Sequence, residues 1–346
     1  MSSSNSTPYT VNQNCQDRLN LVTYTVYITE GIVMCLGNLL LLWPIVFHQG
    51  MRIKKDYILI GGLALADCIN GVAYFIGGID RVSSILICDQ NRPVSRWLCA
   101  KVPSNMLWMF NEVTTGTMMA AISLDRLILV TFPHWYMVQG AGYAYALAAL
   151  VYLHSVIVGL IGTYRVWAIK DVVDKTRMCF FSYASENVHN VYHVSAISYG
   201  ALASVLIYLL VLVFYRKRSS KVSGRTTDAQ AKRQRHMTVS MGISSFFTLI
   251  LFVIPVQFDV IISRYTTLPS TLVAFCYILA NCNAICNLFI YVLRHAEVRK
   301  GMVAALKWQK LPVDMNTWVE KSTSKAATGH RSGYTGGRSG LINNAV

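Results

Sequence analysis

Long apolar segments separated by short polar ones dominate the pattern of this chain. Seven runs of about 20 or more mostly apolar residues are present, and each is long enough to cross a bilayer core of about 30 Å as a helix. These runs cover roughly residues 24–47, 57–78, 101–132, 143–167, 193–215, 237–262 and 268–293. The pattern therefore predicts an all-α membrane protein, folded as a seven-transmembrane helix bundle.

The composition agrees with this prediction. Hydrophobic residues make up 54% of the 346 residues and charged residues only 14%, whereas about 25% of the residues of a soluble domain are charged. The net charge of +15 would also suit a nucleic-acid-binding protein, but most basic residues lie in the polar gaps and the tail, where membrane topology concentrates them. We therefore expect membrane lipid, and no nucleic acid, as a partner.

The distribution of lysine and arginine predicts the orientation in the membrane. The gaps at 48–57, 126–142 and 216–236, together with the tail from residue 294, contain 21 of the 31 basic residues. Because such residues concentrate on the cytoplasmic side, we expect a plasma-membrane protein with an extracellular N-terminus and a cytoplasmic C-terminus. Asn5, in the sequence Asn-Ser-Thr, is a candidate glycosylation site in the predicted extracellular segment.

The same pattern divides the chain into four parts. These are an extracellular N-terminus (1–23), a seven-helix domain (24–293), an amphipathic membrane-surface helix (294–308) and a disordered cytoplasmic tail (309–346). The short helix is predicted because Val298, Met302, Ala305 and Leu306 fall on one helical face. Four cysteines, Cys15, Cys88, Cys99 and Cys179, fall in predicted extracellular regions, where disulfides persist.

The third apolar run contains an abrupt pair of charges, Asp125 and Arg126. Removing either group from water costs several kcal/mol unless it is paired or lies at an aqueous boundary. The pair therefore marks either a helix end that emerges from the membrane or a functional switch at that end. The charge distribution assigns this end to the cytoplasmic side.

A group of polar residues lies at mid-depth in the predicted spans. It consists of Asn38, Asp67, Asn111, Thr115, Asn283 and Asn287. One carboxylate among amide and hydroxyl oxygens fits a hydrated sodium site, because hard cations bind oxygen ligands. It fits equally an uncharged hydrogen-bond network around a protonated Asp67.

Glu112 is a second acidic residue within a span, and Trp108 lies one turn further out on the same side of the helix. An acid inside a span is by default a functional hypothesis, so the two residues are expected to line an outer cavity for a ligand with a cationic or hydrogen-bonding group. The alternatives are a protonated Glu112 bonded to a neighbouring helix, or a pair with Lys101 or Arg264 through water.

The remaining polar and irregular positions have simpler interpretations. Glu30 and Asp259 lie nearer the outer ends and are expected to contact water, and His193 is expected to pack rather than bind metal. Pro255 predicts a kink in the sixth helix. The sequence has no metal-spaced cluster of His and Cys and no nucleophile–base pair, so we expect neither an enzyme nor a cofactor other than a sodium ion at Asp67.

Several short motifs resemble, in their order, spacing and depth, those of rhodopsin-like seven-helix G-protein-coupled receptors. They are Gly37-Asn38, Leu63-Ala64-Leu65-Ala66-Asp67, Ser123-Leu124-Asp125-Arg126-Leu127 with Val130, Pro133 and Tyr136 downstream, Pro255, and Asn287-Leu288-Phe289-Ile290-Tyr291. Within that superfamily the chain is similar to nematode serpentine chemoreceptors of the Srsx class. The chain departs from the family pattern at three positions: Leu127 replaces an aromatic residue, Leu288 replaces a proline and Val253 replaces the aromatic toggle. These departures suit a divergent chemosensory branch.

The resemblance implies a G-protein switch at the inner end of the bundle. Asp125 would hold Arg126 at rest, and activation would free Arg126 to meet the G protein while Tyr291 swings inward. The mid-depth polar residues around Asp67 would form the central network that binds sodium in this family.

The resemblance also implies roles at the outer end. Trp108, Met109 and Glu112 would face the ligand pocket, and Cys99 would be disulfide-bonded to Cys179 in the second outer loop.

We therefore expect a chemosensory G-protein-coupled receptor that transduces the binding of an unidentified small-molecule or peptide ligand to a heterotrimeric G protein. A neuropeptide receptor is the alternative within the class, because the second outer loop (about residues 170–192) is long and carries charges of both signs. A seven-span transporter could also use Asp67, Glu112 and Glu30, but the two halves of the chain show no self-similarity.

Overall fold

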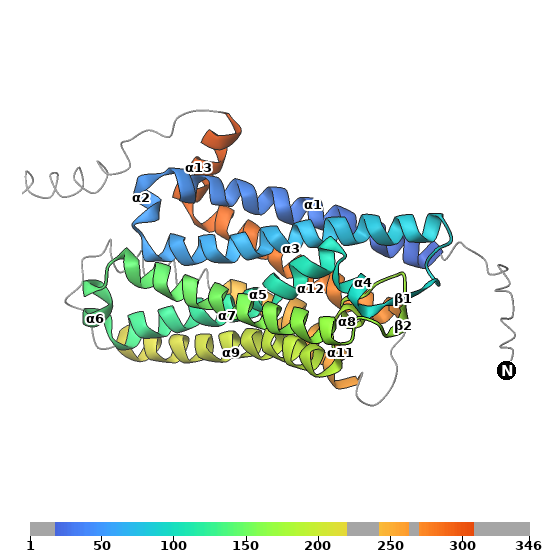
Figure 1. Ribbon diagram of the computed structural model, residues 1–346. Coiled ribbons are helices and arrows are strands. Elements are labelled where there is room, and N and C mark those ends of the chain that lie inside the picture. Colours follow the sequence, from blue (N-terminus) through green and yellow to red (C-terminus); the bar gives the residue numbers. More distant parts are fainter. Residues whose placement is uncertain (1–17, 220–241, 263–269, 308–346) are drawn as a thin grey trace, which may run out of the picture.

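The structure is a computed structural model that describes residues 18–219, 242–262 and 270–307. Seven helices in this part of the chain are long and apolar enough to cross a membrane, as predicted. They lie side by side in one bundle (Figure 1). They are α1 (Arg18–Phe47), α3 (Lys55–Leu86), α5 (Pro103–Thr131), α7 (Ala141–Ala168), α9 (Asn187–Ser219), a sixth span that begins at Gly242 and continues through the π turn η1 (Leu249–Val253) and α11 (Ile254–Ile262), and α12 (Ser270–Arg294).

Short elements cover the two ends of the bundle (Figure 1). At one end lie α2 (Gln49–Arg52), α6 (Pro133–Val138) and α13 (Ala296–Leu306). At the opposite end lie β1 (Pro93–Ser95), α4 (Arg96–Ala100), β2 (Val173–Thr176) and α8 (Phe181–Ala184). The strands β1 and β2 form a two-stranded antiparallel sheet in which Val94 faces Lys175. We refer to the end with α13 as the inner end and to the end with this sheet as the outer end.

Glycine permits the closest helix contacts. A Cβ atom at Gly116 of α5 would lie 2.4 Å from the carbonyl oxygen of Ile197 in α9, and one at Gly31 of α1 would lie 2.6 Å from the carbonyl oxygen of Gly71 in α3. Small residues of this kind let helix backbones approach in a membrane. These contacts help to fix α5 at the centre of the bundle, packed against α3, α7 and α9.

The second span is longer than predicted. The prediction ended it near Gly78, just before Asp80 and Arg81, but α3 continues to Leu86. The two charges do not end the helix because tertiary contacts accommodate them: Asp80 forms an ion pair with Arg177, and Arg81 packs among aromatic rings.

The sixth span is irregular next to its proline. Pro255 is the second residue of α11, and the π turn Leu249–Val253 immediately precedes that helix. Proline has no N–H, and its ring crowds the carbonyl four residues earlier, which here belongs to Leu251 within the wider turn. The sequence located this irregularity correctly, although it did not indicate its π geometry.

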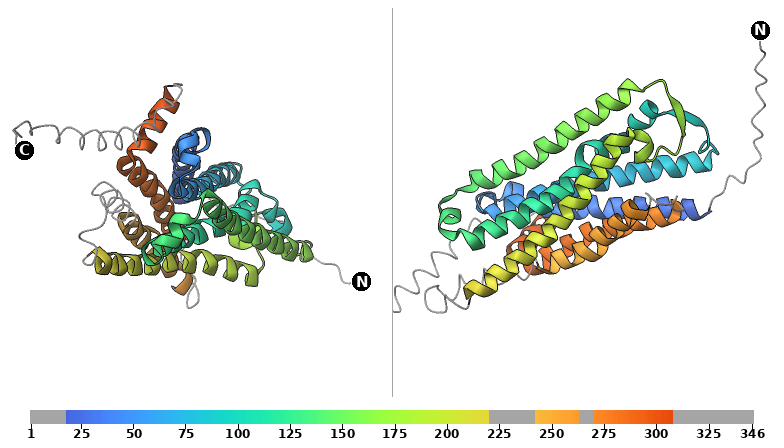
Figure 2. Two further views of the ribbon diagram at one scale, coloured as in Figure 1. Left: turned by 90° about the vertical axis from the view of Figure 1, so that its left-hand side faces the viewer. Right: turned by 90° about the horizontal axis from the view of Figure 1, so that it is seen from below.

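The helix α13 is present. It turns away from the end of α12 and packs on α1 (Figure 2). The side of α13 that packs against the bundle overlaps the predicted apolar face. Val298 is fully buried, and Met302 packs against the same core cluster. Gly301 lies against Pro44 and Ala304 is also buried, whereas Leu306, which was predicted on this face, is 62% exposed.

Candidate functional site

The pair Asp125–Arg126 lies in a buried ion cluster at the inner end of α5. Arg126 is 5% exposed and Asp125 is fully buried. The Nη2 atom of Arg126 contacts the Oδ1 atom of Asp56, in the first turn of α3, and lies 3.5 Å from Oδ2 of Asp125. Asp125, the predicted partner, and an acid on another helix together compensate the charge of the buried arginine.

The segment after α5 completes this cluster. The hydroxyl of Tyr136, in α6, donates a hydrogen bond to Oδ2 of Asp125 at 3.2 Å. Burial raises the pKa of Tyr136 above its usual value, so the phenol stays a proton donor at neutral pH. The Nζ atom of Lys55 lies 3.6 Å from the centre of the Tyr136 ring and donates to the carbonyl of Gln139 at 2.9 Å. These contacts connect α6 to the inner ends of α3 and α5.

Tyr291 is buried deeper in the bundle, beside a small cavity of about 30 Å³. Tyr208 of α9 lines the same cavity, together with Ser244, Asn287 and Ser123. The hydroxyl groups of Ser123 and Ser204 are 2.8 Å apart at its wall and join α5 to α9. A polar space of this size has room for a water molecule.

The six predicted mid-depth polar residues are all buried, but hydrogen bonds do not connect them into one network. Asn111 donates to Asn70 at 3.0 Å, and Asn70 donates to Thr115 at 2.9 Å. In two separate pairs, Thr248 and Ser244 of the sixth span donate to the amide oxygens of Asn283 and Asn287, respectively. Asn38 donates to the carbonyl of Met34 within its own helix.

Asp67 is the acidic member of this layer and is 3% exposed. It lies one turn before Asn70 on α3, and its carboxylate is the one anionic oxygen donor among the six predicted residues. Amide and hydroxyl oxygens from α5 and α12 are buried in the same layer, so the donor types that a hard cation needs are present.

A cavity of about 520 Å³ opens in the outer half of the bundle. Trp108 and Glu112 line it, as predicted, and its other walls are formed by residues of α1, α3, α8, α9, α11 and α12 and of the second outer loop. Met109 does not line it: this side chain is fully buried and accepts a hydrogen bond from Thr163 of α7 at 3.3 Å. The difference arises because successive helical residues point about 100° apart, so Met109 faces α7 while Trp108 faces the cavity.

Other acids of the outer half have partners that the sequence did not indicate. Glu112 lies 3.8 Å from Nδ1 of His193, which is fully buried against the ring of Phe181. Glu30 is buried rather than exposed to water, and Asn281 of α12 donates to it at 3.1 Å. The amide supplies the polar contact that water was expected to supply.

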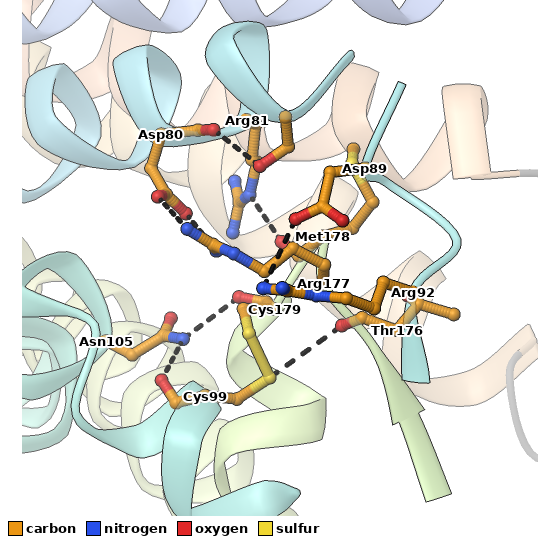
Figure 3. Close-up of polar contacts among 11 residues, drawn as sticks. Asp80, Arg81, Asp89, Arg92, Cys99, Asn105, Thr176, Arg177, Met178 and Cys179 are labelled. Atoms are coloured by element: carbon orange, nitrogen blue, oxygen red, sulfur yellow. Dashed lines mark hydrogen bonds and ion pairs between the residues drawn. A yellow bond between two sulfur atoms is a disulfide. The ribbon is translucent and has the colours of Figure 1, made fainter. Parts of the chain in front are cut away.

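The second outer loop is attached firmly to α3 and α5 (Figure 3). Cys99 and Cys179 form a disulfide, as the resemblance implied, and Asn105 donates to the carbonyl oxygens of both at 2.8 and 2.9 Å. Arg177, two residues earlier, forms two hydrogen bonds with the carboxylate of Asp80. Cys88 is also disulfide-bonded, and Cys15 and the candidate glycosylation site Asn5 lie outside the described residues.

Comparison with known protein families decides the identity of this bundle. Residues 37–291 match the family described as 7 transmembrane receptor (rhodopsin family). The chain belongs to the rhodopsin family of seven-transmembrane receptors. Members of this family bind ligands and couple to heterotrimeric G proteins. No curated protein matches the chain.

Sequence reasoning missed several residues that complete the sites of this receptor. They are Asp56 beside Arg126, Asn70 in the polar network, Tyr208 opposite Tyr291, Arg81 in the outer cavity and His193 beside Glu112. A periodicity argument could have found Asn70, because it follows Asp67 by three residues and shares its helix face. The other four depend on contacts between helices that no short motif specifies.

Proposed function

We propose that this rhodopsin-family receptor detects an extracellular ligand in the outer cavity and activates a heterotrimeric G protein at the inner end. One observation carries the proposal: α5 contributes Trp108 and Glu112 to the 520 Å³ cavity and the buried Arg126 to the ion cluster at its other end. The proposed setting is the plasma membrane, with the N-terminus extracellular, because the lysine and arginine distribution favours that orientation.

Ligand binding is coupled to the inner end because the spanning helices that line the outer cavity extend to the inner end of the bundle. A ligand that contacts α5, α9, α11 and α12 in the outer cavity stabilises the bundle conformation to which it binds more tightly. Opening the inner ends separates Arg126 from Asp56, which belongs to a different helix. Tyr291, which would swing inward on activation, lines the same small cavity as Tyr208 of α9.

A small chemosensory ligand is favoured over a neuropeptide. The cavity volume lies within the range of about 300–1,000 Å³ that is typical of small-molecule sites. Aromatic side chains line much of it, and the disulfide-anchored loop supplies Phe180 and Phe181 to its wall. Membership of the nematode Srsx class is proposed from the divergent positions Leu127, Leu288 and Val253.

We further propose that Asp67 binds a sodium ion. Its buried carboxylate supplies the negative charge, and the oxygen atoms of Thr115 and Asn283 supply neutral donors from α5 and α12. A bound cation would neutralise a charge that burial otherwise makes costly.

The receptor function is tested by nucleotide exchange. The full chain, reconstituted with a panel of Gα subunits, is expected to accelerate exchange on at least one of them, and Arg126→Ala is expected to abolish the acceleration. Transport of labelled solute without any exchange, unchanged by Arg126→Ala, would contradict the proposal and support a transporter.

A further inference from the structure

Arg81 is the arginine that lines the outer cavity, and it is 5% exposed. It lies near the outer end of α3. The carbon atom of its guanidinium group is 5.4 Å from the ring centre of Tyr24, 5.3 Å from that of Trp108 and 5.1 Å from that of Phe180. Three aromatic rings therefore surround a charge that has been removed from water.

The acid next to Arg81 in the chain is already paired. Asp80 forms hydrogen bonds of 2.8 and 3.0 Å with Arg177, which holds its carboxylate away from Arg81 (Figure 3). Other acids of the outer loops are paired in the same way: Asp89, Asp174 and Glu186 have Arg92, Arg96 and Arg165 as partners. Across residues 18–219, 242–262 and 270–307, no carboxylate lies within ion-pair distance of Arg81.

The hydrogen-bond capacity of Arg81 is also largely unused. Its Nε atom donates to the carbonyl oxygen of Met178 at 3.4 Å, a long contact. The remaining N–H donors of the guanidinium donate to no group in the described part of the chain. Buried arginines are normally paired with an anion, and a carboxylate matches their planar fork with two parallel hydrogen bonds.

We propose that the ligand of the outer cavity is an organic acid whose carboxylate docks on Arg81. This inference rests on the proposed function and adds the chemical class of the ligand. The three rings hold the guanidinium in place, and its unused N–H donors bind the two carboxylate oxygens.

Charge in the rest of the cavity sets the orientation of this ligand. Glu112 and Asp259 line the same cavity and would repel a carboxylate near them. The acid group therefore lies at the α3 side, beside Tyr24 and Phe180. The apolar body, or a cationic group of the same molecule, extends toward Glu112 and Asp259.

Matched acids and amides test the assignment. The melting temperature of the full chain in lipid nanodiscs is measured with aliphatic and aryl carboxylic acids and with short hydrophobic peptides that have a free C-terminal carboxylate. The primary amide of each compound is measured in parallel. At least one acid is expected to raise the melting temperature while its amide does not. Arg81→Gln is expected to weaken the apparent affinity for that acid about 30-fold or more, and Arg81→Lys less, because lysine retains the charge but not the fork.

Arg92→Gln is the matched control, because it removes an outer positive charge whose side chain is 57% exposed and lies outside the cavity lining. This variant is expected to bind the acid like the wild type. If Arg81→Gln does not reach the membrane, the acid–amide comparison on the wild type and on Arg81→Lys decides. Equal effects of acid and amide, no stabilisation by any acid, or an affinity unchanged in Arg81→Gln each overturn the inference.

Nucleotide exchange separates this inference from the proposed function. Arg92→Gln, at a residue outside the cavity lining, is expected to retain the ligand-independent exchange of the wild type. Exchange that only amines or neutral molecules stimulate would overturn the acid assignment and leave the receptor function intact. Acid-selective binding without exchange on any Gα subunit would contradict the receptor function and leave the ligand class intact.

Discussion

Arg126 is closer to Asp56, in the first turn of α3, than to Asp125, its neighbour in the chain. The distinction has a mechanical consequence. A pair between adjacent residues of one helix can persist when the helices move apart, whereas a pair between α3 and α5 must break. The contact between Arg126 and Asp56 therefore resists opening at the inner end of the bundle.

Asp56→Asn is expected to raise ligand-independent nucleotide exchange. If the pair with Arg126 favours the closed bundle by about 1 kcal/mol, its loss increases the ratio of open to closed receptors about fivefold. Exchange is measured at equal surface expression, with Asp89→Asn as the control, because Asp89 pairs with an exposed arginine in the outer loops. Unchanged exchange in Asp56→Asn would show that the pair does not restrain opening.

Sodium is expected to stabilise the receptor through Asp67. An ion present at about ten times its dissociation constant contributes about 1.4 kcal/mol to the free energy of unfolding. The wild type should therefore melt at a higher temperature in sodium chloride than in N-methylglucamine chloride of equal ionic strength, and Asp67→Asn should lose the difference. Glu30→Gln, at another buried acid, should keep it. Equal melting of the wild type in both salts would contradict sodium binding.

The outer loop is expected to lose stability at low pH through Asp174. Hydrogen bonds from Arg96 lower the pKa of the Asp174 carboxyl to about 2. Because the pKa of Asp174 is lower in the folded than in the unfolded protein, its ion pair stabilises the fold fully above the ordinary pKa of about 4. This stabilisation is lost as the pH falls toward 2.

The contribution of Asp174 to the free energy of unfolding should stay below about 1 kcal/mol, because its side chain is 35% exposed. Asp174→Asn should therefore melt slightly below the wild type at pH 7, and the two should converge as the pH falls toward 2. If the difference in melting temperature between the wild type and Asp174→Asn grew as the pH fell, the ionised Asp174 would not be the stabilising form.

Two glycine-to-alanine substitutions are expected to differ in their effect on the stability of the receptor. Gly116→Ala forces a methyl group to within 2.4 Å of the backbone of Ile197, so it should destabilise the receptor by about 1–3 kcal/mol. Gly142→Ala, in the first turn of α7, meets nothing within 4 Å and should be neutral or slightly stabilising. Thermal unfolding of the two variants in the same nanodiscs compares them directly, and equal melting temperatures would show that α5 and α9 can move apart at no cost.

Much of the fold was predictable because a bilayer constrains helices strongly. An apolar run of about 20 residues has few alternatives to a spanning helix, so seven spans were predicted, and the described part of the chain contains seven helices of that length and composition. Local chemistry also located the irregular turn beside Pro255 and the short helix at Val298.

Only the tertiary structure decided which of these groups meet. The pairs Arg126–Asp56, Asp80–Arg177 and Glu30–Asn281 join helices or loops that are far apart in the chain. Sequence spacing indicates which residues share a helix face, but the rotation of each helix and its neighbours depend on packing in the whole bundle. For this reason the chain alone predicted a charged switch and an outer cavity. The ion pair of Arg126 with Asp56, and the absence of a carboxylate partner for Arg81 among the described residues, became visible only in the assembled bundle.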